Sequence, residues 1–582
     1  MKNYKKVYAA FILAGGLILH GCNGIFDDLA INPNQPSMGA YFTSPSAVND
    51  AVMTMYGYMS TQRCLGASGS KTTIIRSDEA SSNSDYGKPG MFGADLNASY
   101  YTIEQPYTLM YTTASQASYI IETAPSVDFS GNEELRNAYM GEAYFWRAFA
   151  HYYLLINFRN ISPIRQMPRN GDDYVRPLEK PAAVWNFIQE DLAHAKELLP
   201  VKGYWDSKNA GRVTKASAAA LLGKAYLYRS GIEQYYGEDK TTFYSEAAKE
   251  FGDVIDGKYG TYDLTKNYAD NFDVAHENNE ESILEFQFLG DVDNAGFNPG
   301  LATSGLAFDS RGLMLPGAGV GYEGVVHNWL YNAFVNSVDK DGYTDIRMFS
   351  TMIFNDLDAS IHLRNDAGGN PVRLEGPGGY KWEELYPAKN GKEGFATVSN
   401  PLAHSFKAGI RKGIDCSMPT QTEADGTPKL VGVGAGVKEY VYNQPRAHGV
   451  NWRYIRYADV LMMYAEAIVS GGTQASNMTP LQAVNKVRGR ANMSELPSVT
   501  MTDIQNERIL EFALEGHRFY DLLRWGKLTS RFTELQESDP NFKKFISADD
   551  FKGFVTNKHE WLPIPINEVN SNPYITENNP GY

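Results

Sequence analysis

The chain is poor in cysteine, in positive charge and in long apolar runs. Its 582 residues include 3 cysteines, too few for a dense disulfide framework. The formal net charge is −15, which argues against a nucleic-acid partner, because nucleic-acid-binding proteins present basic surfaces. No apolar run reaches the roughly 18–20 residues that a membrane-spanning helix requires. The body of the chain is therefore expected to lie outside the bilayer.

The sequence also lacks the short motifs of common enzyme classes. It has no G-x-S-x-G, H-E-x-x-H, P-loop or C-x-x-C pattern, and its 10 histidines show no metal-ligand spacing. Asp-rich stretches at 290–296 and 338–345 make a calcium site conceivable, but the acidic residue that closes an EF-hand loop is missing from both. Solvated turns are the expectation there, and we predict no catalytic residue, metal site or other cofactor.

What the chain does have is aromatic residues and a globular balance of side chains. Hydrophobic residues make up 43%, charged residues 21% and aromatics 13%, with 38 tyrosines. Tyrosine joins a flat apolar face to a polar tip, so it suits both the packing of helices and contact with sugar-like ligands. A tyrosine-rich core of stacked helices accounts for most of them in our interpretation.

The N-terminus reads as a lipoprotein export signal. Three lysines precede the apolar run at 7–19, which is too short to span a bilayer, and the stretch "LHGC" ends in Cys22. We predict a signal peptide over 1–21, acylation of Cys22 by palmitate-type chains and a tether over 22–37. More than one acyl chain gives stable anchoring. The alternative is a secreted protein with an incidental cysteine. Cys64 and Cys416 could pair or stay free.

The region 38–264 is predicted to be a helical-repeat unit. Helical apolar spacing marks 44–60, 133–158 and 182–200. In 216–264, Leu222-Gly223 and Tyr226, then Ala247 and Phe251, match the spacing of a tetratricopeptide helix pair. A second pair is predicted at 457–493. The fold class is therefore mostly α, a tetratricopeptide-like helical-repeat scaffold.

The region 265–450 is richer in Gly and Pro and is predicted to be a loop-rich insertion that carries short strands and binds ligand. "SILEFQF" at 282–288 is one expected strand. Rigid scaffolds often present binding residues on such loops. The last part, 451–582, is predicted to be helical and to end in a docked, proline-rich tail.

One helix, predicted over 507–527, resembles an active site at first sight. Glu507, Glu511 and Glu515 lie along one face of it. Carboxylates on one helix project side by side instead of flanking a substrate, and arginines stand at helix-neighbour distances in the sequence: Arg508–Glu511, Glu515–Arg518, Arg518–Asp521 and Asp521–Arg524. We therefore predict a structural ladder of ion pairs that ties helices together, and no catalytic pair.

Several stretches together resemble the SusD/RagB family of Bacteroidetes outer-membrane lipoproteins. They are the Cys22 signal, "NPNQPS" (32–37), "GEAYFWRAFAHYYLL" (141–155), "GRVTKASAAALLGKAYLY" (211–228), "RYIRYADVLMMYAEA" (453–467), "NKVRGRANM" (485–493), the 507–527 stretch and the closing "WLPIPINEVNSNPYITENNPGY". The resemblance implies a tetratricopeptide-like scaffold with a variable ligand-binding part. It also implies an outer-membrane protein facing the cell exterior, which hands an oligosaccharide to a SusC-like TonB-dependent transporter.

Ligand residues do not lie in the shared motifs, so we infer them from chemistry. Sugar capture needs aromatic faces and planar polar groups. Three stretches combine these, and each aromatic could equally pack a loop onto the scaffold. The candidates are Arg76, Asp78, Asn83, Asp85, Tyr86, Phe92 and Asn97 in the first stretch, Phe297, Tyr322 and Trp329 in the second, and Tyr380 and Trp382 in the third.

The expected function is a non-catalytic, glycan-binding surface lipoprotein. A peptide-binding relative with the same scaffold is one alternative, and a glycoside hydrolase using Asp or Glu from the loops is another. The resemblance also implies that the tail folds against the body, with Trp561 and Tyr582 as its expected anchors.

Overall fold

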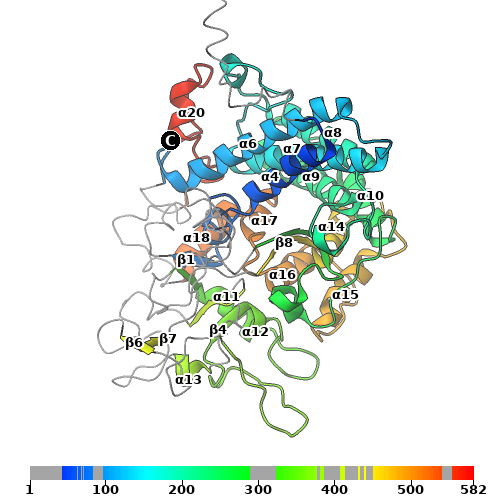
Figure 1. Ribbon diagram of the computed structural model, residues 1–582. Helices are drawn as coiled ribbons and strands as arrows, with labels where there is room; N and C mark the ends of the chain where they lie inside the picture. Colours follow the sequence, from blue (N-terminus) through cyan, green and yellow to red (C-terminus); the bar gives the residue numbers. More distant parts are fainter. Residues whose placement is uncertain are drawn as a thin grey trace, which may run out of the picture.

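A computed structural model describes twelve parts of the chain. They are residues 42–61, 63–66, 69, 71–82, 96–288, 323–376, 381–385, 407–412, 430–432, 438–440, 450–539 and 554–582. These parts are mostly helical (Figure 1), as the sequence predicted. Cys22 and Cys416 lie outside them, and Cys64 is a buried free thiol.

Helices from the first half of the chain form a stack in which each packs on the next. α6 contacts α7, α7 contacts α8, α8 contacts α9, and α9 contacts α10, while α4 lies against α6 and α7. Nearest-neighbour packing of this kind is typical of helical-repeat proteins. Their bounds are α4 Pro45–Met59, α6 Tyr101–Thr123, α7 Glu133–Phe158, α8 Pro181–Leu198, α9 Lys215–Tyr236 and α10 Tyr244–Ile255.

Helices from the end of the chain continue the same stack. α14 packs on α10, α15 and α16 pack on α14, and α17 packs on α9, so both ends of the sequence build one scaffold. Their bounds are α14 Tyr457–Val469, α15 Pro480–Arg490, α16 Met501–Glu511, α17 Arg518–Arg524, α18 Leu528–Ser538 and α20 Ile566–Ser571.

The predicted tetratricopeptide-like pair is α9 and α10. A Cβ atom on Gly223 would lie 2.8 Å from the Phe251 ring, so only glycine lets that ring approach the helix so closely. Ala247 and Phe251 are fully buried. The predicted second pair is α14 and α15, where Ala483 and Val487 are also buried. Small residues at these positions allow the helices to approach one another.

Short strands and helices lie between the two helical parts. β1 Ala80–Ser82, β3 Glu323–Val326, β5 Ala408–Ile410 and β4 Met352–Phe354 form an antiparallel sheet in the order β1-β3-β5-β4. The predicted strand at 282–288 is β2 Ser282–Phe286, which pairs with β8 Trp452–Arg456. β6 Leu430–Gly432 pairs with β7 Lys438–Tyr440. The short helices are α11 Asn328–Val335, α12 Met348–Thr351 and α13 Trp382–Leu385.

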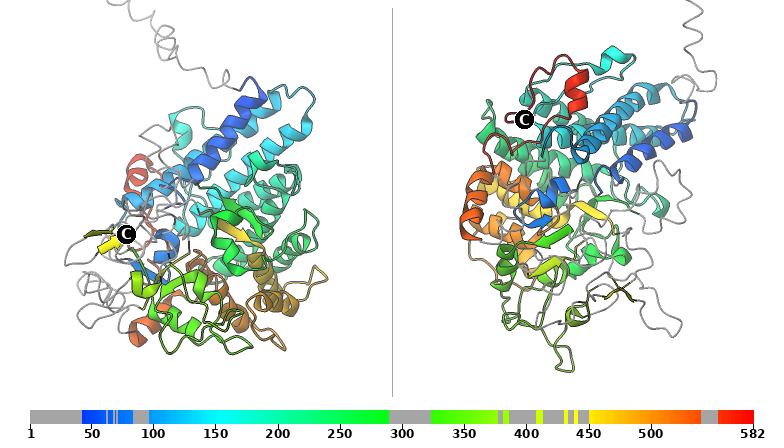
Figure 2. Two further views of the ribbon diagram at one scale, coloured as in Figure 1. Left: turned by 60° about the horizontal axis from the view of Figure 1, so that its bottom comes forward. Right: turned by 90° about the vertical axis from the view of Figure 1, so that its left-hand side faces the viewer.

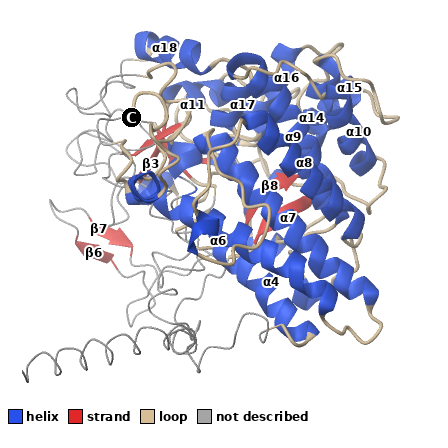
Figure 3. Cartoon of the chain, turned by 90° about the horizontal axis from the view of Figure 1, so that it is seen from above, coloured by secondary structure: helices blue, strands red, loops and turns tan. Residues whose placement is uncertain are grey.

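Single turns of other helix types connect these elements. One is a π-helix, η1 Lys71–Ile75. The 3₁₀ turns are η3 Ala124–Ser126, η4 Gly171–Tyr174, η5 Ser207–Asn209, η6 Tyr268–Phe272 and η7 Val274–His276. Figure 3 shows β8 among the helices of the scaffold, where it contacts α9 and α14, whereas β3 lies beside α11.

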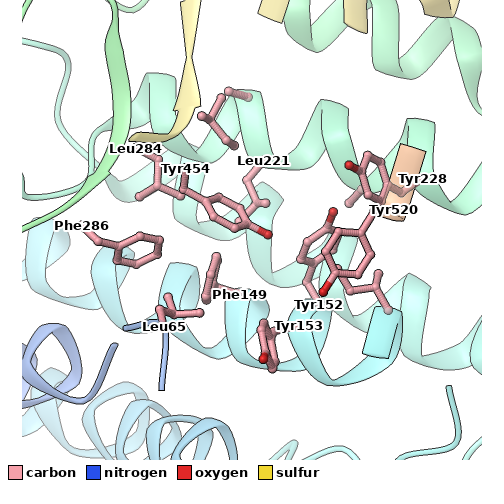
Figure 4. Close-up of a cluster of buried hydrophobic side chains, with 14 of the residues drawn as sticks. Leu65, Phe149, Tyr152, Tyr153, Leu221, Tyr228, Leu284, Phe286, Tyr454 and Tyr520 are labelled. Atoms are coloured by element: carbon pink, nitrogen blue, oxygen red, sulfur yellow. The ribbon is translucent and has the colours of Figure 1, made fainter. Parts of the chain in front are cut away.

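Tyrosine rings fill much of the core between α7, α9 and the β2–β8 pair (Figure 4). Phe149 and Phe286 pack edge to face with ring centroids 5.6 Å apart, and Phe286 and Tyr454 do so at 5.7 Å. Tyr152 and Tyr228 lie deeper in the same cluster and are at most 1% exposed. A tyrosine-rich core of stacked helices is therefore correct for these residues.

The single helix predicted over 507–527 is wrong. α16 ends at Glu511 and α17 begins at Arg518, because the backbone between them turns through positive φ at Leu514 and Gly516. A Cβ atom on Gly516 would lie 2.9 Å from the Thr73 hydroxyl, so the turn lets this backbone come close to the η1 segment. Distant contacts, and not local pattern, end the helix here.

The predicted ladder of neighbours is correct only in part. Asp521 and Arg524 do pair, at 2.8 Å, but the other arginines of that stretch bind distant carboxylates. Arg508 binds Asp459 at 2.8 Å, and Arg518 binds Asp78 at 2.9 Å. The ion pairs tie helices together as predicted, but mostly across the fold.

The C-terminal tail lies against the helices of the first half (Figure 2). The Leu562 amide donates to the Asn157 carbonyl at 2.7 Å, at the end of α7. The Asn579 side chain donates to the carbonyls of Phe158 and Leu562, each at 2.7 Å. The Tyr582 hydroxyl donates to the Trp561 carbonyl at 3.2 Å. The two expected anchors thus lie together, and Trp561 is 7% exposed.

Candidate functional site

Five of the predicted ligand residues lie in the described parts of the chain. They are Arg76, Asp78, Asn97, Trp329 and Trp382. The other seven lie outside the described residues: Asn83, Asp85, Tyr86, Phe92, Phe297, Tyr322 and Tyr380.

Arg76 is fully buried and holds three parts of the fold together. Its guanidinium donates to the Asn157 side chain at 3.1 Å and to the carbonyls of His559 and Glu560 at 3.2 and 3.0 Å. It also lies 4.0 Å from the centroid of the Phe519 ring. The prediction that Arg76 contacts ligand is therefore corrected. An arginine without access to solvent has a structural role, here between α7 and the tail.

Asp78 is also fully buried, and its carboxylate accepts from Arg518 at 2.9 Å and from Arg531 at 2.7 Å. Burial alone would raise the pKa of Asp78, but attraction by Arg518 and then Arg531 outweighs it and lowers that pKa. Asp78 therefore stays ionised, and its ion pairs join the segment that precedes β1 to α17 and α18. The predicted ligand contact is corrected for this residue too, and Asp78 does not bind Arg76.

Trp329 lies directly beside Asp78 and Arg531. Its indole nitrogen donates to the Asp78 carbonyl, and the Arg531 guanidinium lies 4.2 Å from its ring centroid. The residue is half-buried. Two of the predicted stretches, far apart in sequence, therefore meet at Asp78 and Trp329. At this point Trp329 fixes the start of α11 to the segment that precedes β1.

The ends of these two stretches also meet in the sheet. β1 and β3 are antiparallel with Ser82 opposite Glu323, so the chain leaves β1 and enters β3 at the same edge. Six of the twelve predicted ligand residues belong to the segments 83–95 and 289–322, which follow β1 and precede β3 in the sequence and lie outside the described residues. The structure thus brings one end of each of the first two predicted stretches together, in the pairing of β1 with β3.

The first stretch returns to the described chain at an exposed group of polar and aromatic residues. Asn97 is exposed and its side chain accepts from the Ser99 amide at 2.9 Å. The Tyr100 and Tyr101 rings follow with centroids 5.3 Å apart, and Tyr101 is 40% exposed. An amide beside aromatic rings suits a sugar surface. Tyr101 was missed by the sequence reasoning, because only the tertiary structure shows which tyrosines of α6 face solvent.

Trp382 in the third stretch is 6% exposed, so its ring packs into the fold and offers no face to a ligand. The neighbouring Glu383 accepts from Arg373 at 2.9 Å, and Arg373 also binds Asp356 at 2.8 Å. These pairs fix α13. The prediction for Trp382 is corrected to a packing role.

The carboxylates that resemble an active site are locked inside the fold. Glu511 is fully buried and accepts from Arg456 at 2.6 Å, from Arg347 at 3.0 Å and from Arg490. Burial would raise the pKa of Glu511, but Arg490, Arg456 and Arg347 together hold it well below its usual range. A carboxylate that stays ionised and shielded cannot deliver a proton to a substrate, so this cluster is structural.

Two further searches bear on function. Within the described ranges, no group of three or more His, Cys, Asp and Glu side chains could hold a metal ion. Among the helices that the structure describes, none combines the length and the apolar character needed to cross a bilayer.

Comparison with known proteins shows a consistent likeness. A family described as "SusD family" matches residues 422–582, and one described as "Starch-binding associating with outer membrane" matches residues 31–227. A SusD-like protein of Bacteroides ovatus is 24% identical over 99% of this chain and 98% of its own length.

Solved structures share the fold over almost the whole chain. A SusD superfamily protein from Bacteroides vulgatus has a TM-score of 0.67 and 22% identity, covering 93% of this chain and 100% of that one. Surface glycan-binding protein A from Bacteroides thetaiotaomicron, in complex with laminarihexaose, has a TM-score of 0.65 and 19% identity, covering 92% of this chain and 100% of that one. With matches at both ends of the sequence and a tetratricopeptide-like helical scaffold, the chain belongs to the SusD/RagB family.

Proposed function

We propose that this protein is a non-catalytic glycan-binding lipoprotein of the outer-membrane surface. In this proposal it captures an oligosaccharide and passes it to a SusC-like TonB-dependent transporter. Asn97, Tyr100 and Tyr101 form the binding surface among the described residues, and the candidates that lie outside those residues, Asn83, Asp85, Tyr86, Phe92, Phe297, Tyr322 and Tyr380, stay predictions.

The observation that carries the proposal is the common edge where β1 ends and β3 begins. Ser82 lies opposite Glu323 there, and buried ion pairs of Asp78 hold the base rigid. The exposed Tyr101 ring supplies a flat apolar face just after the first predicted stretch.

The relatives supply the ligand class. One matching family is described as starch-binding, and one structural neighbour was solved with laminarihexaose. Carbohydrate binding without chemistry also fits the shielded state of Glu511. Cys22 in its lipoprotein-type signal supports the anchor, and the family description supports the outer membrane.

Isothermal titration calorimetry tests the ligand class. The wild-type chain is titrated with laminarin, amylose, an inulin-type fructan and host mucin glycans, each as polymer and as trisaccharide. We expect binding to at least one polymer. Tyr101→Ala should weaken it by about 2–13-fold, the equivalent of roughly 0.5–1.5 kcal/mol for one aromatic contact.

The matched control is Tyr235→Ala, because Tyr235 is 56% exposed on α9, outside the proposed surface. Absence of binding to every glycan contradicts the proposal. Binding of peptides in the same assay would replace the glycan cargo, and release of shorter sugars over hours would indicate a hydrolase.

Metabolic labelling with palmitate tests the anchor. The wild-type chain should take up label and fractionate with outer membranes, whereas Cys22→Ala should do neither. Label in the variant would contradict acylation at this residue. Co-purification with a transporter barrel from solubilised membranes tests the partner.

A further inference from the structure

Two exposed tyrosines outside the proposed surface stand on segments that lie side by side. Tyr574 in the tail is 59% exposed and Tyr174 at the end of η4 is 57% exposed. Most tyrosines in the described chain are buried or half-buried. Within the described chain, neither of these two rings packs on another aromatic ring or on a cation. Both therefore present free faces to solvent.

A hydrogen bond joins the two segments close to these rings. The Asn572 side chain donates to the Arg176 carbonyl at 2.9 Å. Asn572 precedes Tyr574 by two residues, and Arg176 follows Tyr174 by two. The Ser162 hydroxyl donates to the same carbonyl at 3.0 Å. The backbone that carries the two rings is therefore fixed on both sides.

Arg176, whose carbonyl accepts both of these hydrogen bonds, also brings a charged side chain to this group. It is half-buried, and its guanidinium makes no hydrogen bond or ion pair with the described residues. A guanidinium offers five N–H donors in a planar fork. These donors are available to hydroxyl oxygens of a ligand.

α20 connects this group to the Tyr101 surface. At its start, the Ile566 amide donates to the Ala98 carbonyl at 2.8 Å, and Asn567 donates to Glu104 in the first turn of α6. At its end stands Asn572, bound to Arg176. Six residues of helix span about 9 Å. One short helix of the tail therefore connects the segments that carry the two groups.

We propose that Tyr174, Arg176 and Tyr574 form a second contact for the same glycan chain, continuous with the Tyr101 surface along α20. This inference rests on the proposed function and makes it more specific. The ligand is a long, uncharged glycan, because a net charge of −15 disfavours a polyanion. Affinity then increases with chain length beyond what the Tyr101 surface alone would give.

The test compares long and short forms of one glycan. Laminarin with laminaritriose, and amylose with maltotriose, are titrated into wild type, the double variant Tyr174→Ala/Tyr574→Ala and Arg176→Gln. We expect each variant to weaken polymer binding, the double variant by about 4-fold or more if each ring adds the about 2–13-fold of one aromatic contact. Trisaccharide binding should not change, because that ligand fits on the Tyr101 surface alone.

Tyr235→Ala serves again as the exposed-tyrosine control, and circular dichroism checks that every variant is folded. Equal loss for polymer and trisaccharide, or no loss for the polymer, overturns the second contact while leaving the proposed function intact. If the wild-type chain binds no glycan of the panel, both proposals are wrong.

Discussion

Replacing the carboxylate of Glu511 distinguishes a structural cluster from a catalytic one. Glu511 is buried and neutralises parts of three guanidinium groups, on Arg347, Arg456 and Arg490. Glu511→Gln keeps the shape of the side chain and removes its charge. Removing one partner from a buried ion pair costs about 3–5 kcal/mol, because the remaining charges stay desolvated and uncompensated.

The expected change in melting temperature follows from the size of the chain. At about 2.1 cal/mol/K per residue, the 561 residues from 22 to 582 give an unfolding entropy of roughly 1.2 kcal/mol/K. The Glu511→Gln variant should then melt roughly 2.5–4 °C below wild type in a circular dichroism scan, if the chain unfolds as one unit.

A surface pair supplies the control. Glu534 is 61% exposed and binds Arg531 at 3.0 Å, so Glu534→Gln should change stability by less than about 1 kcal/mol. The reasoning is refuted if Glu511→Gln melts like wild type. It is also refuted if that variant stays fully stable and loses a glycan-cleaving activity that wild type has.

Three further changes have defined outcomes. Deleting residues 561–582 removes the buried hydrogen bonds to the end of α7, so the melting temperature should fall clearly; an unchanged melt would mean that the tail does not stabilise the body. Gly223→Val places atoms against the Phe251 ring and should lower the free energy of unfolding by about 1–3 kcal/mol through overpacking, as measured by urea titration. Gly57→Ala, with open space around it, should be neutral or slightly stabilising in the same measurement. Burial raises the pKa of Glu79 to about 8. The protonated Glu79 therefore contributes fully to the free energy of unfolding below about pH 4.3, and this contribution declines by at most about 1.4 kcal/mol per pH unit as pH rises toward 8. Glu79→Gln should remove the decline, and parallel pH profiles of stability for variant and wild type would contradict this prediction.

Local patterns predicted much of the scaffold because helix pairs depend on neighbours in the sequence. The spacing of Leu222, Gly223 and Phe251 indicated α9 and α10, and the structure packs the Phe251 ring against Gly223. The apolar run at 133–158 became α7 with the same bounds. Each of these features depends on residues within one helix or one helix pair, which a short window can detect.

The candidate site was harder to predict, since burial depends on contacts made across hundreds of residues. Arg76 and Asp78 look like ligand groups in a loop, but their partners are Glu560 and Arg518. Nothing near residue 78 in the sequence signals Arg518. A charged side chain in a polar loop has the same local pattern whether it faces solvent or a partner from the far end of the chain.

The amino-acid sequence by itself determined that this protein is mostly helical and that its helices pair, because these features depend on spacing along the chain. Only the tertiary structure decided where the stretch at 507–527 breaks, which charges are buried, and that β1 pairs with β3, a strand far from it in the sequence. Those outcomes depend on which surfaces come into contact when the whole chain folds, and no local pattern in the sequence indicates the free energy of such contacts.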